Sequence, residues 1–247
     1  IHMVTAADGA EKYYTLENNT ARYENNLELA RETDRKLKNA WYGHPNYAIV
    51  DNKGTFRDKI NRVYNLTLQM IGLVAEKPRE DNKFLIKRNE GDPLIPKLPD
   101  HIKVEVFDLE DTYLHSREKD VENKLRKRGQ NGSYLYEHSI TKYPRDLDSE
   151  EYRRDGVESK KHISGREYLY LYEARDKNRK TLLKKRQCFF WEGQFLFIDT
   201  FLNVKDGFSI IYLDSEVDVK TLNLPFEIVK DVTHDGEYSS YRLSKIE

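Results

Sequence analysis

The chain has little of three features that would each point to a particular class of protein. Its single cysteine, Cys188, excludes a framework of disulfide bonds and favours a reducing compartment. No run of about 18 apolar residues occurs, so the sequence predicts no membrane-spanning helix. The 42 basic and 43 acidic side chains nearly cancel, so no overall field attracts nucleic acid or an anionic membrane. We therefore expect a cytoplasmic protein without a nucleic-acid partner, in which recognition of anions is local.

The first 75 residues show an α/β pattern. Asn26 and Thr55 are placed to cap two helices, and Tyr47–Val50 is a short apolar strand between them. A strand followed by a helix that covers it is typical of the last unit of a larger sheet. The hydrophobic content of 38% is sufficient for a folded core in a chain of 247 residues.

A domain boundary is predicted near residues 76–80, because the stretch that follows, to residue 100, is rich in proline and charge. Beyond it, segments rich in Tyr, Phe, Ile and Leu are separated by turn sequences such as EGQ and HDGE. Candidate strands cover 83–87, 102–114, 124–128, 134–142, 167–174, 181–191, 194–203, 208–219 and 238–243. Strands of this number and spacing favour a barrel or a sandwich.

Alternating charges mark several of these strands. They are Lys124, Arg126 and Arg128 in ENKLRKRGQ, Lys184 and Arg186 in LLKKRQ, and Asp214, Glu216 and Asp218 in YLDSEVD. Residues two apart in a strand point to the same face, so each set lines one side of its strand. Buried ions without partners are costly, so a closed barrel holds them only if its lumen is wet and its cations face a multiply charged anion. This pattern predicts a pocket for a polyphosphate or a phosphorylated head group.

A resemblance to a known family rests on several segments. They are TAADGAEKYYTLENNTARYE, WYGHPNYAIVDN and FRDKINRVYNLTLQMIGL, and then LEDTYL, LRKRGQNGSYLY, SGREYLYLYEARD and FLFIDTF. Through these segments the chain resembles the TRPL translocation defect proteins over nearly its whole length. These proteins join a P-loop NTPase domain to a domain like the triphosphate tunnel enzymes of the CYTH superfamily. The implied fold is α+β: residues 1–77 are the C-terminal portion of a P-loop domain, and residues 78–247 form a CYTH-like antiparallel β-barrel.

The loop that cradles phosphates, G-x-x-x-x-G-K-[ST], is not found, and none of the twelve glycines precedes a lysine. We therefore expect the chain to be part of a longer protein, which as a whole binds GTP or ATP. The resemblance directs Arg22 toward a nucleotide phosphate and places Asp51 and Asn52 near a purine. A helix cap at Asn52 and a surface ion pair at Arg22 are equally compatible with the sequence.

In the second domain the resemblance implies a set of phosphate-binding cations: Lys83, Arg126, Arg128, Lys142, Lys184 and Arg186. Arginine suits this role because its planar fork makes bidentate contacts with phosphate. The metal-loading E-x-E-x-K of the superfamily aligns with Arg79, Asp81 and Lys83, so a cation replaces one carboxylate and weakens any Mg²⁺ site. Asp214 and Glu216 remain as weak metal ligands, or as partners of the arginines. No catalytic residue is predicted.

Three functions stay open. The first is a module that binds a phosphoinositide head group or a nucleotide or polyphosphate, within a GTP- or ATP-binding trafficking protein peripheral to endomembranes. The second is a metal-dependent triphosphate hydrolase of the tunnel type. Separately, we expect NTPase activity only where the P-loop half is present, and not from this chain. The third is an interaction component of a larger, for example cytoskeletal, assembly. We expect the first, and we expect Tyr168, Tyr170 and Tyr172 to share one strand face as packing residues.

Overall fold

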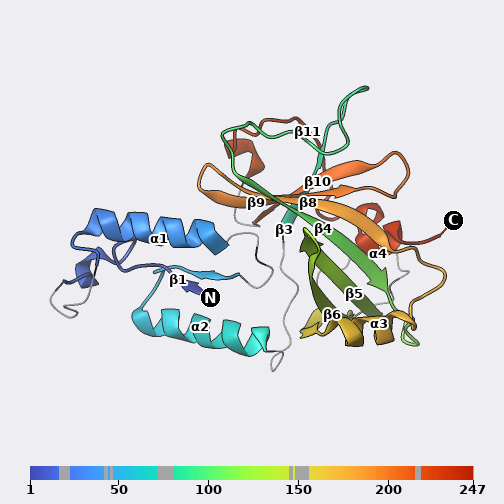
Figure 1. Cartoon of the computed structure of the whole chain (residues 1–247), viewed down its shortest axis with the longest axis horizontal. Helices are drawn as coiled ribbons and strands as arrows, with labels where there is room; N and C mark the ends of the chain where they lie inside the picture. Colours follow the sequence, from blue (N-terminus) through green and yellow to red (C-terminus); the bar gives the residue numbers. More distant parts are fainter. Residues whose placement is uncertain are drawn as a thin grey trace. The chain divides into compact units, whose positions relative to one another are not determined.

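The computed structural model of the chain describes residues 1–16, 23–41, 44, 47–71, 81–144, 147, 156–214 and 218–246. The chain divides into two compact units, unit 1 at residues 1–74 and unit 2 at residues 75–247. The boundary expected from the sequence, after residue 77, lies close to this division. Figure 1 shows unit 1 from dark blue to cyan and unit 2 from teal to red. Among the described residues, no helix has the length and apolar character needed to cross a membrane.

Unit 1 consists of β1 (His2–Met3), η1 (Glu11–Tyr13), α1 (Leu27–Trp41), β2 (Ile49–Val50) and α2 (Phe56–Met70). The two strands pair in parallel, and the helices lie on opposite sides of them (Figure 1). Both predicted helix caps are confirmed. The Asn26 side chain accepts a hydrogen bond from the amide of Leu29 at 2.8 Å, and Thr55 forms a capping box with Asp58.

Unit 2 is built on one sheet of nine strands. They are β3 (Asp81–Ile86), β4 (Val104–Tyr113), β5 (Val121–Gln130), β6 (Ser133–Lys142), β7 (Val157–Ile163), β8 (Leu182–Trp191), β9 (Gln194–Phe201), β10 (Phe208–Asp214) and β11 (Ile228–Asp231). Every pair is antiparallel, and the spatial order is β11-β3-β10-β9-β8-β4-β5-β6-β7. The helical elements are α3 (Gly165–Tyr172), η2 (Val219–Thr221), η3 (Gly236–Tyr238) and α4 (Ser240–Leu243). The predicted α+β class is confirmed.

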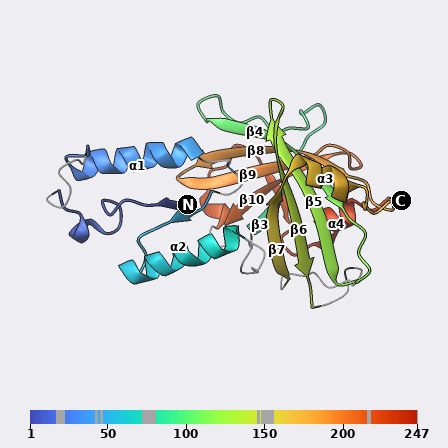
Figure 2. The same ribbon diagram turned by 60° about the horizontal axis from the view of Figure 1, so that its bottom comes forward.

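The sheet curls strongly (Figure 2), but it does not close into the predicted barrel. Closure requires the two edge strands to pair with each other. In the part of the chain that the structure describes, the edges are β11 and β7, and no ladder joins them. The edge strand β11 is only four residues long, and its register with β3 shifts between Ile228 and Lys230. A short, irregular edge of this kind ends pairing rather than extending it.

Two predicted strands are helical. The segment 167–174 belongs mostly to α3, because the Ser164 side chain accepts a hydrogen bond from the amide of Glu167 at 3.2 Å and so starts a helix. Tyr168 and Tyr172 therefore share a face, whereas Tyr170 is 80% exposed on another, so the expected common face of the three tyrosines is wrong. The segment 238–243 forms the end of η3 and α4, and strands β7 and β11 were missed.

The two faces of the sheet are packed differently. One face carries two apolar clusters, the first around Phe189, Leu196 and Ile198 and the second around Leu125 beneath α3. The opposite face carries a third cluster at one end, where Tyr238 of η3 and Leu243 of α4 cover Leu182, Phe201 and Ile210. The rest of this opposite face is rich in charged side chains. We name the whole of this second face the charged face.

Candidate functional site

Strand alternation gathers cations on the charged face. Strand β5 places Lys124, Arg126 and Arg128 there, and β8 places Lys184 and Arg186 there. Because β4 lies between these two strands, their side chains converge over it from both sides. The alternation predicted from the sequence is thus found in both strands.

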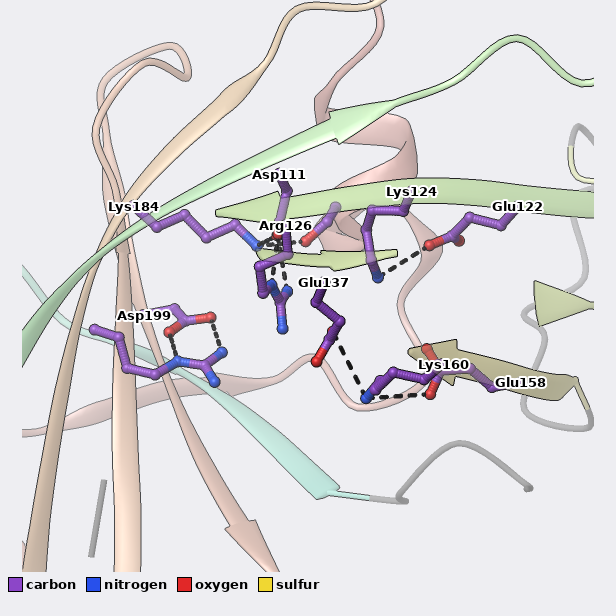
Figure 3. Close-up of polar contacts among 11 residues, drawn as sticks. Asp111, Glu122, Lys124, Arg126, Glu137, Glu158, Lys160, Lys184 and Asp199 are labelled. Carbon is purple, nitrogen blue, oxygen red and sulfur yellow. Dashed lines mark hydrogen bonds and ion pairs between the residues drawn. The ribbon is translucent and has the colours of Figure 1, made fainter. Parts of the chain in front are cut away.

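Asp111 of β4 lies at the point of convergence (Figure 3). Its carboxylate accepts hydrogen bonds from Arg126 Nε at 2.6 Å, from Arg126 Nη2 at 2.9 Å and from Lys184 Nζ at 2.7 Å. Asp111 is 0% exposed and Lys184 is 2% exposed. Burial alone would raise the pKa of Asp111, but the attraction of Arg126 and Lys184 outweighs it and holds that pKa well below its usual range. Lys184 also donates to Ser240 Oγ of α4 at 2.9 Å.

Arg186 is held in the same way by Asp199 of β9. Its Nε and Nη2 donate to the two carboxylate oxygens at 2.6 and 2.7 Å, and Asp199 is 1% exposed. A guanidinium has five N–H donors, so these forks occupy only part of the capacity of Arg126 and Arg186. Among the residues that the structure describes, the Nη1 groups of both arginines donate no hydrogen bond, and the two side chains are 22% and 15% exposed.

Arg128 is the third arginine of this region, and it is almost fully buried. Its guanidinium lies 4.1 Å from the centroid of the Phe107 ring, and its Nη2 lies 4.0 Å from Cys188 Sγ. Burial, together with repulsion from Arg186 and Arg126, lowers the pKa of Arg128 to about 10. Cys188 is itself buried.

We name Arg126, Arg128, Lys184, Arg186, Asp111 and Asp199 the central cluster. Its four cations and two carboxylates leave a formal excess of two positive charges. Toward β7 the formal charge of this face changes from positive to negative, because three carboxylates there meet two lysines (Figure 3). Lys124 lies 3.3 Å from Glu122. Lys160 lies 3.9 Å from Glu137 and 3.4 Å from Glu158. The charged face therefore has a positive centre and an acidic end.

The other two predicted cations, Lys83 and Lys142, lie on different faces of the sheet. Lys83 is on the charged face of β3, where its Nζ lies 5.9 Å from the centroid of the Tyr212 ring. Lys142 is on the opposite face of β6, and its exposed ammonium pairs with Glu118 at 3.1 Å. The prediction that Lys142 joins the other cations was wrong. Glu137 of β6 pairs with Arg126 and shares its face, and Lys142 lies an odd number of positions further along β6, so its side chain points to the other face.

The residues predicted to form a metal site fall partly outside the described residues, because Arg79 and Glu216 are not among them. Asp214 lies at the end of β10, opposite Asp81 of β3. In the described ranges no group of three or more His, Cys, Asp or Glu side chains is arranged to hold a metal. Two carboxylates are fewer ligands than a hard divalent cation takes, so these residues alone do not fit a Mg²⁺ site.

The predicted nucleotide residues lie in unit 1. The side-chain amide of Asn52 donates to the carbonyl oxygens of Thr5 and Asp8 at 2.7 and 2.6 Å and accepts from Lys59 Nζ at 2.6 Å, so it ties the loop after β1 to α2. Asp51 pairs with Arg62 at 3.2 Å. Asn52 is not a helix cap, because Thr55 caps α2. Arg22 lies outside the described residues.

The two carboxylates that organise the central cluster, Asp111 and Asp199, were not predicted from the sequence. On its own strand face, Asp111 lies between Leu109 and Tyr113, and Asp199 lies between Phe197 and Phe201. A lone carboxylate at an inward strand position needs a cationic partner, and that signal was present in both segments. The sequence did not show which cation is the partner, because that depends on the order of the strands in the sheet.

No protein-family model matches the chain, and no curated protein matches it. Among solved structures, the chain is similar to the hypothetical protein NE1496 at 19% identity and a TM-score of 0.44, over 69% of this chain and 97% of that one. It is also similar to the PH1819 protein from Pyrococcus horikoshii OT3 at 14% identity and a TM-score of 0.38, over 57% of this chain and 80% of that one. At these TM-scores the likeness says nothing about function.

Proposed function

We propose that unit 2 is an anion-binding module whose central cluster recognises a phosphorylated ligand, either a phosphoinositide head group or a nucleotide or polyphosphate. One observation carries the proposal. Arg126 and Arg186 are each held by a buried carboxylate, while both side chains are partly exposed and their Nη1 groups keep donors that no described residue uses. A guanidinium that is already fixed in position loses little entropy when it binds, and its planar fork matches phosphate oxygens.

The charges of the central cluster also support this proposal. Arg126 and Arg186 lie near enough to Arg128 to lower its pKa, after the larger effect of burial. A ligand with two or more negative charges offsets the formal excess of two positive charges and relieves this repulsion. Charge-assisted hydrogen bonds to phosphate are about twice as strong as neutral ones, so phosphate is a suitable partner.

The proposal extends to the longer protein. We place this module, with a CYTH-like fold, in a GTP- or ATP-binding trafficking protein of the TRPL translocation defect kind, with unit 1 as part of its nucleotide domain. Exposed apolar residues on α2 and at its C-terminal cap favour this arrangement, because Phe56, Tyr64 and Ile71 are 74%, 63% and 61% exposed. A larger sheet with its covering helices would bury such a surface.

Titration calorimetry with tripolyphosphate, an inositol bisphosphate and GTP tests the binding function. The informative variant is Asp199→Asn with Arg186→Gln, because these two side chains are hydrogen-bonded to each other and the change removes a cation without leaving its carboxylate buried and charged. We expect binding to weaken by a factor of about 10 or more, since a hydrogen bond to a charged group contributes about 1.5–3 kcal/mol.

Lys142→Ala is the control, because Lys142 lies on the other face of the sheet. Equal affinities of the double variant and the wild type would reject the central cluster as the site. Release of phosphate from tripolyphosphate in the presence of Mg²⁺ would instead establish the alternative, a hydrolase.

A further inference from the structure

A cavity of about 590 Å³ lies in unit 2, lined by the turn between β9 and β10 and by the C-terminal helix α4 with its flanks. Its volume is within the range of about 300–1,000 Å³ that holds small organic ligands. Four cationic side chains line it, Lys180, Lys205, Arg242 and Lys245, with Glu237 as the single carboxylate. None of these residues belongs to the central cluster, so the cavity is a separate feature.

The cations of this cavity are compensated far less than those of the central cluster. Arg242 Nη1 pairs with Glu237 at 2.9 Å. Lys180, Lys205 and Lys245 take part in no ion pair within the described part of the chain. The lining therefore has a formal excess of three positive charges, in a chain whose net charge is −1. Such a local excess attracts anions, in particular dianions.

The rest of the lining is apolar and consists of Val204, Phe208, Leu243 and Ile246. The Phe208 ring packs against Phe201 with 4.9 Å between centroids, so this part of the wall is continuous with the third apolar cluster. Ile246 is 53% exposed, so a ligand in the cavity would remove part of its surface from water. Apolar surface beside uncompensated ammonium groups suits a ligand with both an apolar and an anionic part.

We propose that this cavity binds a small amphiphilic anion, with a phosphate or carboxylate head against the lysines and an apolar group of several carbons against Phe208 and Leu243. Burial of each methylene group is expected to strengthen binding by about fourfold until the apolar part of the cavity is filled. Inorganic phosphate has no such part and is expected to bind far more weakly.

The test is a titration of the full chain, followed by NMR or calorimetry, with inorganic phosphate and with ethyl, butyl and hexyl phosphate. Heptanoate distinguishes a carboxylate head from phosphate, and hexanol shows whether the anion is needed. We expect affinity to rise along the alkyl series and hexanol to bind at least ten times more weakly than hexyl phosphate. We also expect the variant Lys205→Glu/Lys245→Glu to bind hexyl phosphate at least ten times more weakly than the wild type. Both lysines are exposed, so this variant is expected to keep the wild-type melting temperature.

The matched control is Lys97→Glu/Lys220→Glu, which makes the same change of charge at two exposed lysines outside the cavity. Unchanged binding in the Lys205/Lys245 variant, an equal loss in the control, or affinity independent of alkyl length would overturn the proposal. The variant Asp199→Asn/Arg186→Gln, which removes a mutually paired cation and carboxylate of the central cluster, separates it from the proposed function. Loss of hexyl phosphate binding in that variant would show that the ligand binds at the central cluster and would reject the cavity as its site.

Discussion

Asp111 accepts hydrogen bonds from two cations that come from different neighbours of β4, Arg126 on β5 and Lys184 on β8. Removing it leaves both cations without their buried counter-ion. We predict that Asp111→Ala lowers the free energy of unfolding by about 3–5 kcal/mol, as measured by urea denaturation. The control is Asp108→Ala, on the same strand but the opposite face, which loses only a solvent-exposed ion pair with Lys185 and should cost under about 1 kcal/mol. Equal losses in the two variants would contradict this account.

The two buried carboxylates also predict how stability depends on pH. Burial alone would raise the pKa values of Asp111 and Asp199, but the attraction of their cations is stronger and lowers both in the folded state. The ionised carboxylates therefore stabilise the fold above the unfolded-state pKa of about 4, and this contribution is lost as the pH falls below that value. The melting temperature of the wild type should fall more steeply below about pH 4 than that of Asp111→Asn/Asp199→Asn. Parallel curves would show that these residues do not titrate as proposed.

At the scale of elements, α3 replaces a predicted strand, and a pair of variants tests the difference. Tyr168 is 6% exposed and packs on Tyr136, with 4.8 Å between ring centroids, whereas Tyr170 is 80% exposed. We predict that Tyr168→Ala destabilises the protein by about 3 kcal/mol or more in urea denaturation. Tyr170→Ala should change the stability by no more than about 0.5 kcal/mol. On a strand the two side chains would share a face, so comparable losses would favour the strand.

At the scale of the whole molecule, the nine-stranded sheet and its three apolar clusters belong entirely to unit 2. We predict that residues 75–247, produced alone, unfold in urea at the same midpoint as the corresponding transition of the full chain. Asp111→Ala should lower both midpoints equally, which identifies the transition. A clearly lower midpoint for the isolated unit would show that unit 1 contributes to its stability.

The sequence by itself determined the features that depend on local periodicity and local chemistry. These are the caps at Asn26 and Thr55, most of the strand positions, the α+β class, and the shared face of Arg126 with Arg128 and of Lys184 with Arg186. Alternation in a strand and capping of a helix involve residues only two to four positions apart, so the residue types are sufficient to predict them. The same local chemistry was available for α3, where Ser164 and Glu167 have the spacing of a helix start.

Only the tertiary structure decided which charges meet. Asp111 is separated by 15 positions from Arg126 and by 73 from Lys184, and it joins them because β4 lies between β5 and β8. The outward position of Lys142, the open edges of the sheet and the lysine-lined cavity beside α4 follow from strand order and register in the same way. Pairing between distant strands is selected by the burial of whole faces, and no short stretch of sequence contains that information.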